Sequence, residues 1–554
     1  MGNNAPTFDF GIVEPKVNSW FETALLYEGQ GTVKLTSPKG TVTGPFVAQF
    51  GDDGTSRIET VFERLSPTDP DHDGGPIAFL CGAKPEQFGK MMRWSFSGMQ
   101  NPCQSLSFAT AAGTFLSTGK VEWAGMNWGT APTRLRFFVR EGKFETKNTN
   151  PPRYFVIPLF NCVAALTNVF YGEHPLRIFP TPQVPNNVPP EIRVTANLIA
   201  NEKNSVLAFT VDEKLCFIER VPDYEAHLAG LKTGGARRRI TAVLVGDMGA
   251  NSVETLADFN SWFPYEIFSA LGFASGVEVG WPWIEIRDDQ GRLIRRLHGG
   301  TRIPSFSEVQ EVFGQFSRPG TGDFVTRFLL LPEEERTYLQ VVMNHARLGT
   351  FGSHMHLHDL LDHLVRALEC VCREFKPRLT QQDLLSGLTV EMQKQVKELI
   401  KEFATKFREL ADDARGSGNV EDYRLLATIV GQAETIAQAN KLGLAVVALL
   451  NKLVLHDAEV LDKFFVSKGR PDWATLVSKY RNATIHEGYL DFSKKHDPRE
   501  VVQLCLHLKD VLTRIILKKC GYSGTYDCLL RHIYGPQPID WVCVDTDASQ
   551  LGFT

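Results

Sequence analysis

The chain has 554 residues, of which 43% are hydrophobic, and a formal net charge of −5. The length suggests about two to four domains, and the composition is ordinary for a soluble globular protein. The charge balance excludes a global basic field, so any contact with RNA or DNA has to come from a local patch.

The first residues lack the basic region and the apolar core of a signal peptide. Pro6 stands where a myristoylation signal needs Ser or Thr, and the longest apolar run, 442–450, is too short to span a bilayer. The ten cysteines contain no Cys-x-x-Cys pair, which argues against a zinc ribbon. We therefore expect a cytoplasmic protein with reduced cysteines, no membrane partner and no cofactor.

Residues 1–305 have the pattern of strands and turns. The segment 23–50 alternates short β-branched and aromatic runs with Gly and Pro, and 276–300 has the pattern of a hairpin that turns at 289–291. Short strands at this spacing predict a β-sandwich or a barrel-like domain.

Beyond residue 305 the apolar residues recur with helical spacing. The clearest case is 390–410, where apolar residues follow one helix face and Lys and Glu follow the other. The glycines of 413–419 then predict the loop of a helix hairpin. Further helices are expected near 357–376, 421–466, 471–487 and 498–519. The predicted fold class is α+β, with a β-rich sensor or regulatory region (1–305), a helical linker (306–350), an all-α domain (351–534) and a C-terminal tail (535–554).

Two segments imitate ligand-binding loops. Residues 69–74 place aspartates and a glycine at the offsets of an EF-hand loop, but Leu80 occupies the position of its bidentate Glu. Residues 113–121 imitate a phosphate loop, but one residue too many separates the glycines, and Val121 replaces the magnesium-binding hydroxyl. We expect neither segment to bind its ligand.

Two polar clusters are ambiguous. His354 and His358 share a helix face, as metal ligands can, but no second pair completes a site, so no metal is expected. The basic loop of 234–239, with Arg237, Arg238 and Arg239, is either a solvated turn or a contact for RNA.

The segment 478–492, SKYRNATIHEGYLDF, carries Arg481, Asn482 and His486 within a helical pattern. Arg–His pairs at similar spacing occur at three other places, but those cross a hairpin, a proline or a Gly-rich break. On a helix Asn482 and His486 lie nearly above one another, and Arg481 lies about 140° round from His486. The alternative is a solvent-facing helix with a buried, satisfied histidine.

These three residue types suit the cleavage of RNA without a metal. Histidine exchanges a proton near neutral pH, and arginine presents a planar fork that can stabilise the charge developing on a phosphate. Asparagine can orient either group or the ribose. Such a site allows the 2′-hydroxyl to attack the adjacent phosphate and leave a 2′,3′-cyclic phosphate.

The segment RNATIHEGYLDF (481–492) resembles the signature of HEPN-domain ribonucleases, and HLHDLLDHLVRALECVCREF (356–375) is similar to the first helix of that family. The helical resemblance covers about residues 350–534, and the layout, with a β-rich half before this domain, resembles the ApeA-like HEPN proteins, which are bacterial antiphage factors. The resemblance implies that Arg481 and His486 are catalytic, that Asn482 assists, and that two motifs face each other across a homodimer or higher homo-oligomer. It also implies cleavage of RNA in an infected cell, released by a phage-derived or host trigger. Glu369 is either an accessory residue of this site or a surface charge.

Two other functions remain open. Some members of the HEPN family are inactive, so the chain could be a non-catalytic dimerisation and ligand-binding protein. A carbohydrate-binding sandwich is a weaker alternative, suggested by five tryptophans that could equally lie in a core. They are Trp94, Trp123, Trp128, Trp281 and Trp283.

Overall fold

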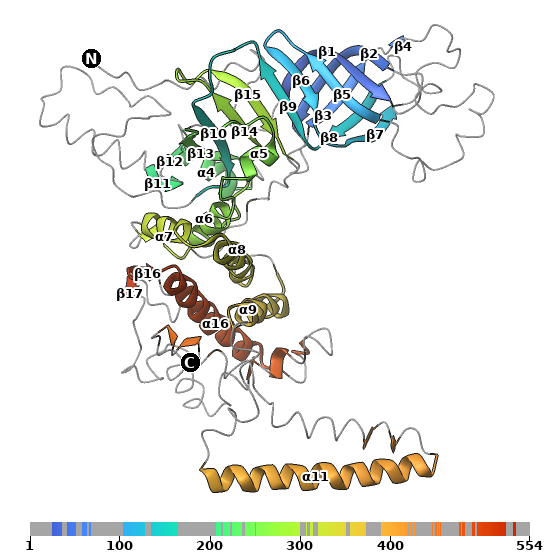
Figure 1. Cartoon of the computed structure of the whole chain (residues 1–554), viewed down its shortest axis with the longest axis vertical. Coiled ribbons are helices and arrows are strands. Elements are labelled where there is room, and N and C mark those ends of the chain that lie inside the picture. The colour runs from blue at the N-terminus through green and yellow to red at the C-terminus, as the bar shows by residue number, and fades with distance from the viewer. Residues whose placement is uncertain are drawn as a thin grey trace, which may run out of the picture. The chain divides into compact units, whose positions relative to one another are not determined.

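The structure is a computed structural model of the whole chain (Figure 1). The chain divides into two compact units, Met1–Arg336 and Thr337–Thr554. The structure describes residues 25–35, 41–50, 58–63, 66–67, 103–127, 134–163, 206–211, 214–221, 224–234, 239–249, 251–299, 306, 311–313, 320–350, 355–372, 389–418, 422–423, 425–426, 446, 449–450, 452–453, 455, 476–477, 479–481, 483, 490–492, 496–527 and 536–538.

The first unit is built on a 15-stranded antiparallel sheet. The strand order is β11-β12-β13-β10-β14-β15-β9-β6-β5-β1-β2-β3-β8-β7, with β4 beside β2. The strands are β1 (Leu25–Leu35), β2 (Thr41–Phe50), β3 (Ile58–Glu63), β4 (Ser66–Pro67), β5 (Cys103–Ala109), β6 (Gly113–Ser117), β7 (Val121–Asn127), β8 (Arg134–Val139), β9 (Gly142–Thr146), β10 (Tyr154–Phe160), β11 (Val206–Val211), β12 (Lys214–Arg220), β13 (Ile240–Asp247), β14 (Trp283–Arg287) and β15 (Leu293–His298).

Burial along the strands reflects what covers each face. In β6 every second residue is buried, which is the pattern of a strand with one face in solvent. In β10 all seven residues are buried, so both faces are covered. Pro158 lies inside β10, opposite Val243 of β13 and beyond Val156, where the pairing with β14 ends.

The helices of this unit are α4 (Tyr224–Lys232), α5 (Leu256–Asn260), α6 (Ile267–Ser275) and α7 (Gly320–Leu329). Helix α5 begins with a capping box, in which the side chain of Thr255 accepts from the backbone N–H of Asp258 and the carboxylate of Asp258 accepts from the backbone N–H of Thr255. Phe155 of β10 lies 5.1 Å, between ring centroids, from Phe259 of α5. An aromatic core therefore joins α5 to the sheet.

The second unit holds the remaining elements: α8 (Glu333–Leu348, whose first residues belong to the first unit), α9 (Leu357–Val371), α11 (Val390–Gly416), α16 (Pro498–Lys519), β16 (Thr525–Asp527) and β17 (Pro536–Pro538). Helices α8 and α9 run antiparallel, because Tyr338 and His345 of α8 contact Cys370 and His363 of α9 in reverse order. Gly349 lies between them, where a Cβ atom would come 2.6 Å from Cγ of Leu364. Only glycine allows this close approach.

Helix α16 is buried around most of its circumference, including polar side chains. Its Lys509 donates to the carbonyl of Ala346 in α8, at 2.8 Å. Its Arg514 donates to the Tyr526 hydroxyl at 2.6 Å, and that hydroxyl donates to Asp510 at 2.8 Å. These bonds satisfy buried polar groups and attach β16 to α16.

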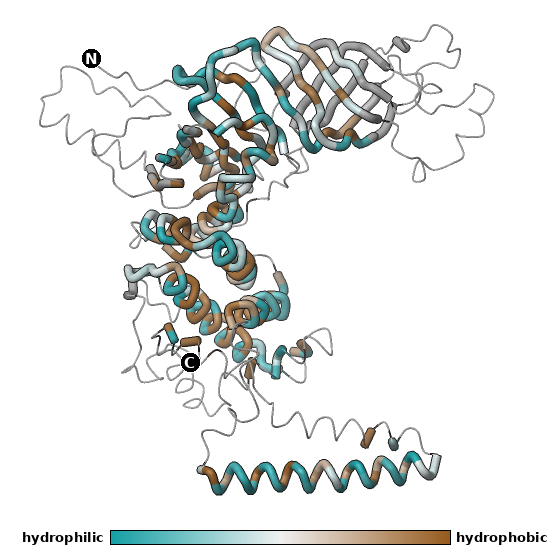
Figure 2. Tube along the Cα trace, in the orientation of Figure 1, coloured by the Kyte–Doolittle hydropathy of each residue, from teal (hydrophilic) through white to brown (hydrophobic). Residues whose placement is uncertain are grey.

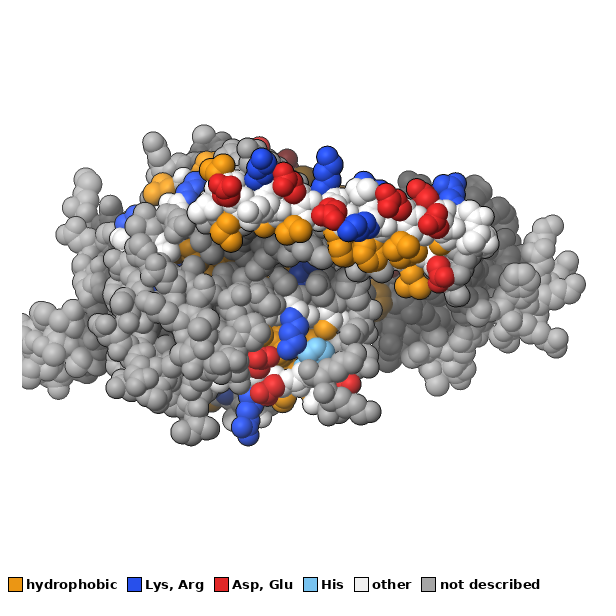
Figure 3. Space-filling view, turned by 90° about the horizontal axis from the view of Figure 1, so that it is seen from below, with side chains coloured by type: hydrophobic (Ala, Val, Ile, Leu, Met, Phe, Trp, Pro, Cys, Tyr) orange, Lys and Arg blue, Asp and Glu red, His pale blue; other side chains and the backbone are white. Residues whose placement is uncertain are grey.

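Helix α11 confirms the predicted amphipathic pattern and ends as expected, with Ser417 as C-cap and Gly418 at φ +77°. Figure 2 shows the alternation of hydrophilic and hydrophobic residues along it. Its apolar face is less buried than the pattern suggests, since the exposed fractions of Leu399 and Phe403 are 64% and 44%. In Figure 3 a row of hydrophobic side chains follows one edge of α11, next to charged ones.

The α+β class is confirmed, and so are the hairpin around residues 289–291 and the helices near 357–376 and 498–519. Residues 113–121 form β6, a turn and the start of β7, so no phosphate loop lies there. Residues 69–74 and most of 421–466 and 471–487 lie outside the described residues. The sandwich and the bundle of HEPN type remain predictions. Among the described helices, none combines the length and the apolar character that crossing a membrane requires.

Candidate functional site

Arg481 and Glu369, separated by more than a hundred residues in sequence, meet in the second unit. Nη2 of Arg481 lies 2.7 Å from Oε1 of Glu369, which belongs to the last turns of α9. The exposed fractions of the two side chains are 36% and 26%. The pair is thus half-buried and reachable from solvent. Glu369 thus contacts the first residue of the motif, and its role as an accessory residue remains a prediction.

The residue before Arg481 attaches this part of the chain to α16. Tyr480 is fully buried, and its hydroxyl donates to the carboxylate of Glu500 in the first turn of α16. Lys479 lies 3.7 Å from the same carboxylate. The ring of His496 lies 5.4 Å from that of Tyr480. The position of Arg481 is therefore set by a buried side chain on one side and by α9 on the other.

The other two motif residues, Asn482 and His486, lie outside the described residues. Their predicted roles, as assisting residue and as general acid or base, remain predictions. The described neighbours Arg481 and Ala483 are helical, as the sequence pattern predicts.

A second pair of residues in this unit was not foreseen from the sequence. Nδ1 of His345 in α8 lies 2.9 Å from Nδ1 of His363 in α9. At this distance the N–H of one ring donates a hydrogen bond to the nitrogen of the other. Burial lowers the pKa of both histidines, and each also responds to the charges of Asp362 and Arg366. The sequence shows a histidine on each of two consecutive helices, but whether the two rings meet depends on how α8 and α9 are aligned along each other.

The predicted metal-free character of the unit is not tested. Among the described residues no three His, Cys, Asp or Glu side chains converge in a way that could hold a metal ion. His354 lies outside them, and His358, the residue that would share its helix face, pairs with Asp359 at 3.4 Å. No disulfide joins any of six described cysteines: Cys162, Cys216, Cys370, Cys372, Cys505 and Cys520.

The predicted basic loop is only partly described. Arg237 and Arg238 lie outside the described residues, and Arg239 stands just before β13 with a half-buried side chain. Its backbone carbonyl accepts from the N–H of Asn161 at 2.9 Å. The backbone of Arg239 thus joins the end of β10, and an RNA contact by this loop remains a prediction.

The β-rich unit contains an ionic core formed by Glu285, Arg287 and Arg296. Glu285 of β14 is fully buried between Arg287 and Arg296, with Nη2 of Arg296 at 2.6 Å. Burial alone would raise the pKa of Glu285, but the two arginines outweigh it and lower the pKa to about 2. The sequence contains an indication of this cluster, because Glu285 and Arg287, two residues apart in one strand, share a face. Arg296 is the strand partner of Glu285.

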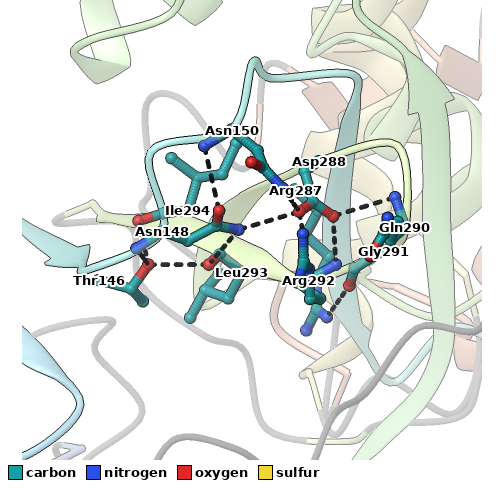
Figure 4. A network of polar contacts seen from close by, with 10 residues as sticks. All are labelled: Thr146, Asn148, Asn150, Arg287, Asp288, Gln290, Gly291, Arg292, Leu293 and Ile294. Carbon is teal, nitrogen blue, oxygen red and sulfur yellow. Dashed lines mark hydrogen bonds and ion pairs between the residues drawn. The ribbon is translucent and has the colours of Figure 1, made fainter.

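At the end of the same hairpin, Asp288 organises the turn (Figure 4). Its carboxylate accepts from the side chains of Asn148 at 3.1 Å, Asn150 at 2.8 Å and Arg292 at 2.9 Å. Burial would raise the pKa of Asp288, but these bonds lower it to about 2. These hydrogen bonds fix the turn of the hairpin against the segment after β9.

Of the five tryptophans, Trp281 and Trp283 are buried, and Nε1 of Trp283 donates to Glu285 at 3.1 Å. These two rings are core residues and present no face to a sugar. Trp123 belongs to β7, and Trp94 and Trp128 lie outside the described residues.

The chain matches no protein-family model, no curated protein and no solved structure. The function is therefore inferred from the site itself.

Proposed function

We propose that the chain is a metal-independent endoribonuclease of HEPN type that acts as a homodimer or higher homo-oligomer, with a β-rich, sandwich-like half that receives a trigger. One observation carries the proposal: Arg481, the first residue of the Arg–Asn–His motif, is half-exposed and paired with Glu369 on α9. Glu369 was named from the sequence as a candidate accessory residue. A purely structural ion pair between Arg481 and Glu369 would not require Asn482 directly after the arginine and His486 further along the same segment.

In the proposed reaction Arg481 holds a phosphate of the RNA and stabilises its developing negative charge. His486 exchanges the proton. The 2′-oxygen forms a bond to phosphorus as the bond to the 5′-oxygen breaks. The proton of the 2′-hydroxyl passes to a base, and the 5′-oxygen receives a proton from an acid. One motif supplies one histidine, so a second copy of the chain would supply the other group.

The test is incubation of the purified chain with total RNA in EDTA. We expect wild type to leave 2′,3′-cyclic phosphate ends, and His486→Ala to cleave about 10²–10⁴-fold more slowly, as is typical for loss of a general acid or base. His358→Ala, in which a half-exposed histidine of α9 is removed, is the matched control and should cleave like wild type. Cleavage that is lost in EDTA, or that survives in His486→Ala, contradicts the proposal.

A non-catalytic interaction protein is the second candidate, and α11 is the observation that favours it. Met392, Leu399, Phe403 and Leu410 expose between 44% and 64% of their surface on that helix. Exposed apolar side chains at helical spacing suit a binding surface. Under this alternative His486→Ala would retain the biological activity of wild type.

A further inference from the structure

We propose that Glu369 masks Arg481. In the RNA-free protein the carboxylate of Glu369 is paired with the guanidinium of Arg481, and a phosphate of the RNA has to displace this carboxylate before it can bind the arginine. The inference rests on the proposed function, since it assigns Arg481 to the substrate phosphate. It adds a residue that restrains the site from within the same chain.

The packing of the unit holds both partners of the ion pair in position. Glu369 lies on α9, which packs against α16, and Arg481 follows Tyr480, which is fastened to Glu500 of α16. Both partners are thus held by packed elements, and they meet at 2.7 Å. Two flexible surface side chains would lose rotamer freedom to form such a contact, whereas these two are already brought together.

The charges around the ion pair also support the masking of Arg481. Helix α9 contains three acidic residues and one arginine, Arg366. Arg366 lies three residues before Glu369, hence on the same side of the helix, and pairs with Asp362 at 2.7 Å. Arg366 and Arg481 therefore each face a carboxylate of α9. A phosphate that approaches Arg481 meets the negative charge of Glu369, which repels it.

The size of the effect follows from Coulomb's law. A carboxylate about 5 Å from a phosphate, at the edge of a protein, opposes binding by roughly tenfold at low salt. We therefore expect Glu369→Gln, which keeps the shape of the side chain and removes its charge, to bind RNA about tenfold more tightly. The gain should shrink in about 0.5 M salt, where exposed charges are screened.

The experiment measures fluorescence anisotropy of a labelled single-stranded RNA oligonucleotide with the full chain in EDTA, with the variants made in the His486→Ala background. Cleavage is measured separately on the same variants in a second background that keeps His486. Asp362→Asn is the matched control, because it removes a carboxylate from the same helix and leaves the Arg481 contact intact. Glu369→Ala is a second variant, and melting curves identify any variant that fails to fold. We expect a tighter complex for both Glu369 variants, a change of less than about twofold for Asp362→Asn, and loss of the gain when Arg481→Ala is added.

The outcomes separate this inference from the proposed function. If Arg481→Ala weakens RNA binding and cleavage but no folded Glu369 variant binds more tightly, the masking role is wrong and the ribonuclease proposal stands. If the Glu369 variants bind more tightly through Arg481 but the wild-type chain cleaves no RNA, masking stands and the catalytic proposal falls. If Arg481→Ala changes nothing in either background, both are wrong. An equal gain in Asp362→Asn also overturns masking, since the effect would then belong to net charge.

Discussion

Lys509 is the residue whose replacement should change the stability of the chain most clearly. It is only 3% exposed in the middle of α16, and its Nζ donates to the carbonyl of Ala346. Burial, together with the nearby charge of Arg347, lowers its pKa from 10.5 to about 7. Between these two values the unfolded chain holds a proton that the folded chain has released, so stability rises with pH across this window.

At 1.36 kcal/mol per pKa unit, the buried amine lowers the unfolding free energy by about 4 kcal/mol at pH 7 and by about 1 kcal/mol at pH 9.5. Lys509→Met removes this cost and also a hydrogen bond that contributes about 1 kcal/mol. We therefore expect the variant to be more stable than wild type by about 3 kcal/mol at pH 7 and by less than about 1 kcal/mol at pH 9.5.

The assay is urea unfolding of wild type and variant at several pH values, since the difference between them cancels the other titrating groups. Lys518→Met, at a partly exposed position near the end of the same helix, is the control and should change stability by less than about 0.5 kcal/mol. A variant that is no more stable than wild type at pH 7, or a difference that does not shrink toward pH 9.5, would refute the reasoning.

Three further predictions concern stability. Tyr480→Phe should lower the unfolding free energy by about 1–2 kcal/mol, because the buried carboxylate of Glu500 loses the hydrogen bond from the hydroxyl; an unchanged urea midpoint would contradict this. The melting temperature should fall as the pH drops below the ordinary value of 6.5, because the lowered pKa values of His345 and His363 let the unfolded chain take up protons first. His363→Gln should flatten that pH profile, and an equally steep profile would assign it to other groups. Glu285→Gln should lower the unfolding free energy by about 3–5 kcal/mol, since two buried arginines lose their counter-charge; a urea midpoint equal to that of wild type would disprove the role of this ionic core.

Local features of the fold could be predicted from the sequence. The hairpin at 283–298 follows from alternating strands around a Gly turn, and α11 ends where two glycines interrupt its period. Helix α16 begins at Pro498 after the N-cap Asp497, whose side chain accepts from the backbone N–H of Arg499. Such features depend on backbone hydrogen bonds and steric limits within a few residues, so the local sequence contains the information.

The candidate site was only partly predictable. Arg481 could be singled out from its motif, but its contact with Glu369 depends on how α9 packs, and no local pattern specifies that. Lys509 and Ala346 are 163 residues apart, and the local sequence around neither residue indicates the hydrogen bond between them. The sequence by itself indicated the hairpin at 283–298, the helices α9, α11 and α16, and the residue types that could act on a phosphodiester, but it did not indicate the helices α4, α5 and α6 within the β-rich half. Only the tertiary structure decided which charges face each other and which are buried, because these depend on the packing of elements distant in the chain.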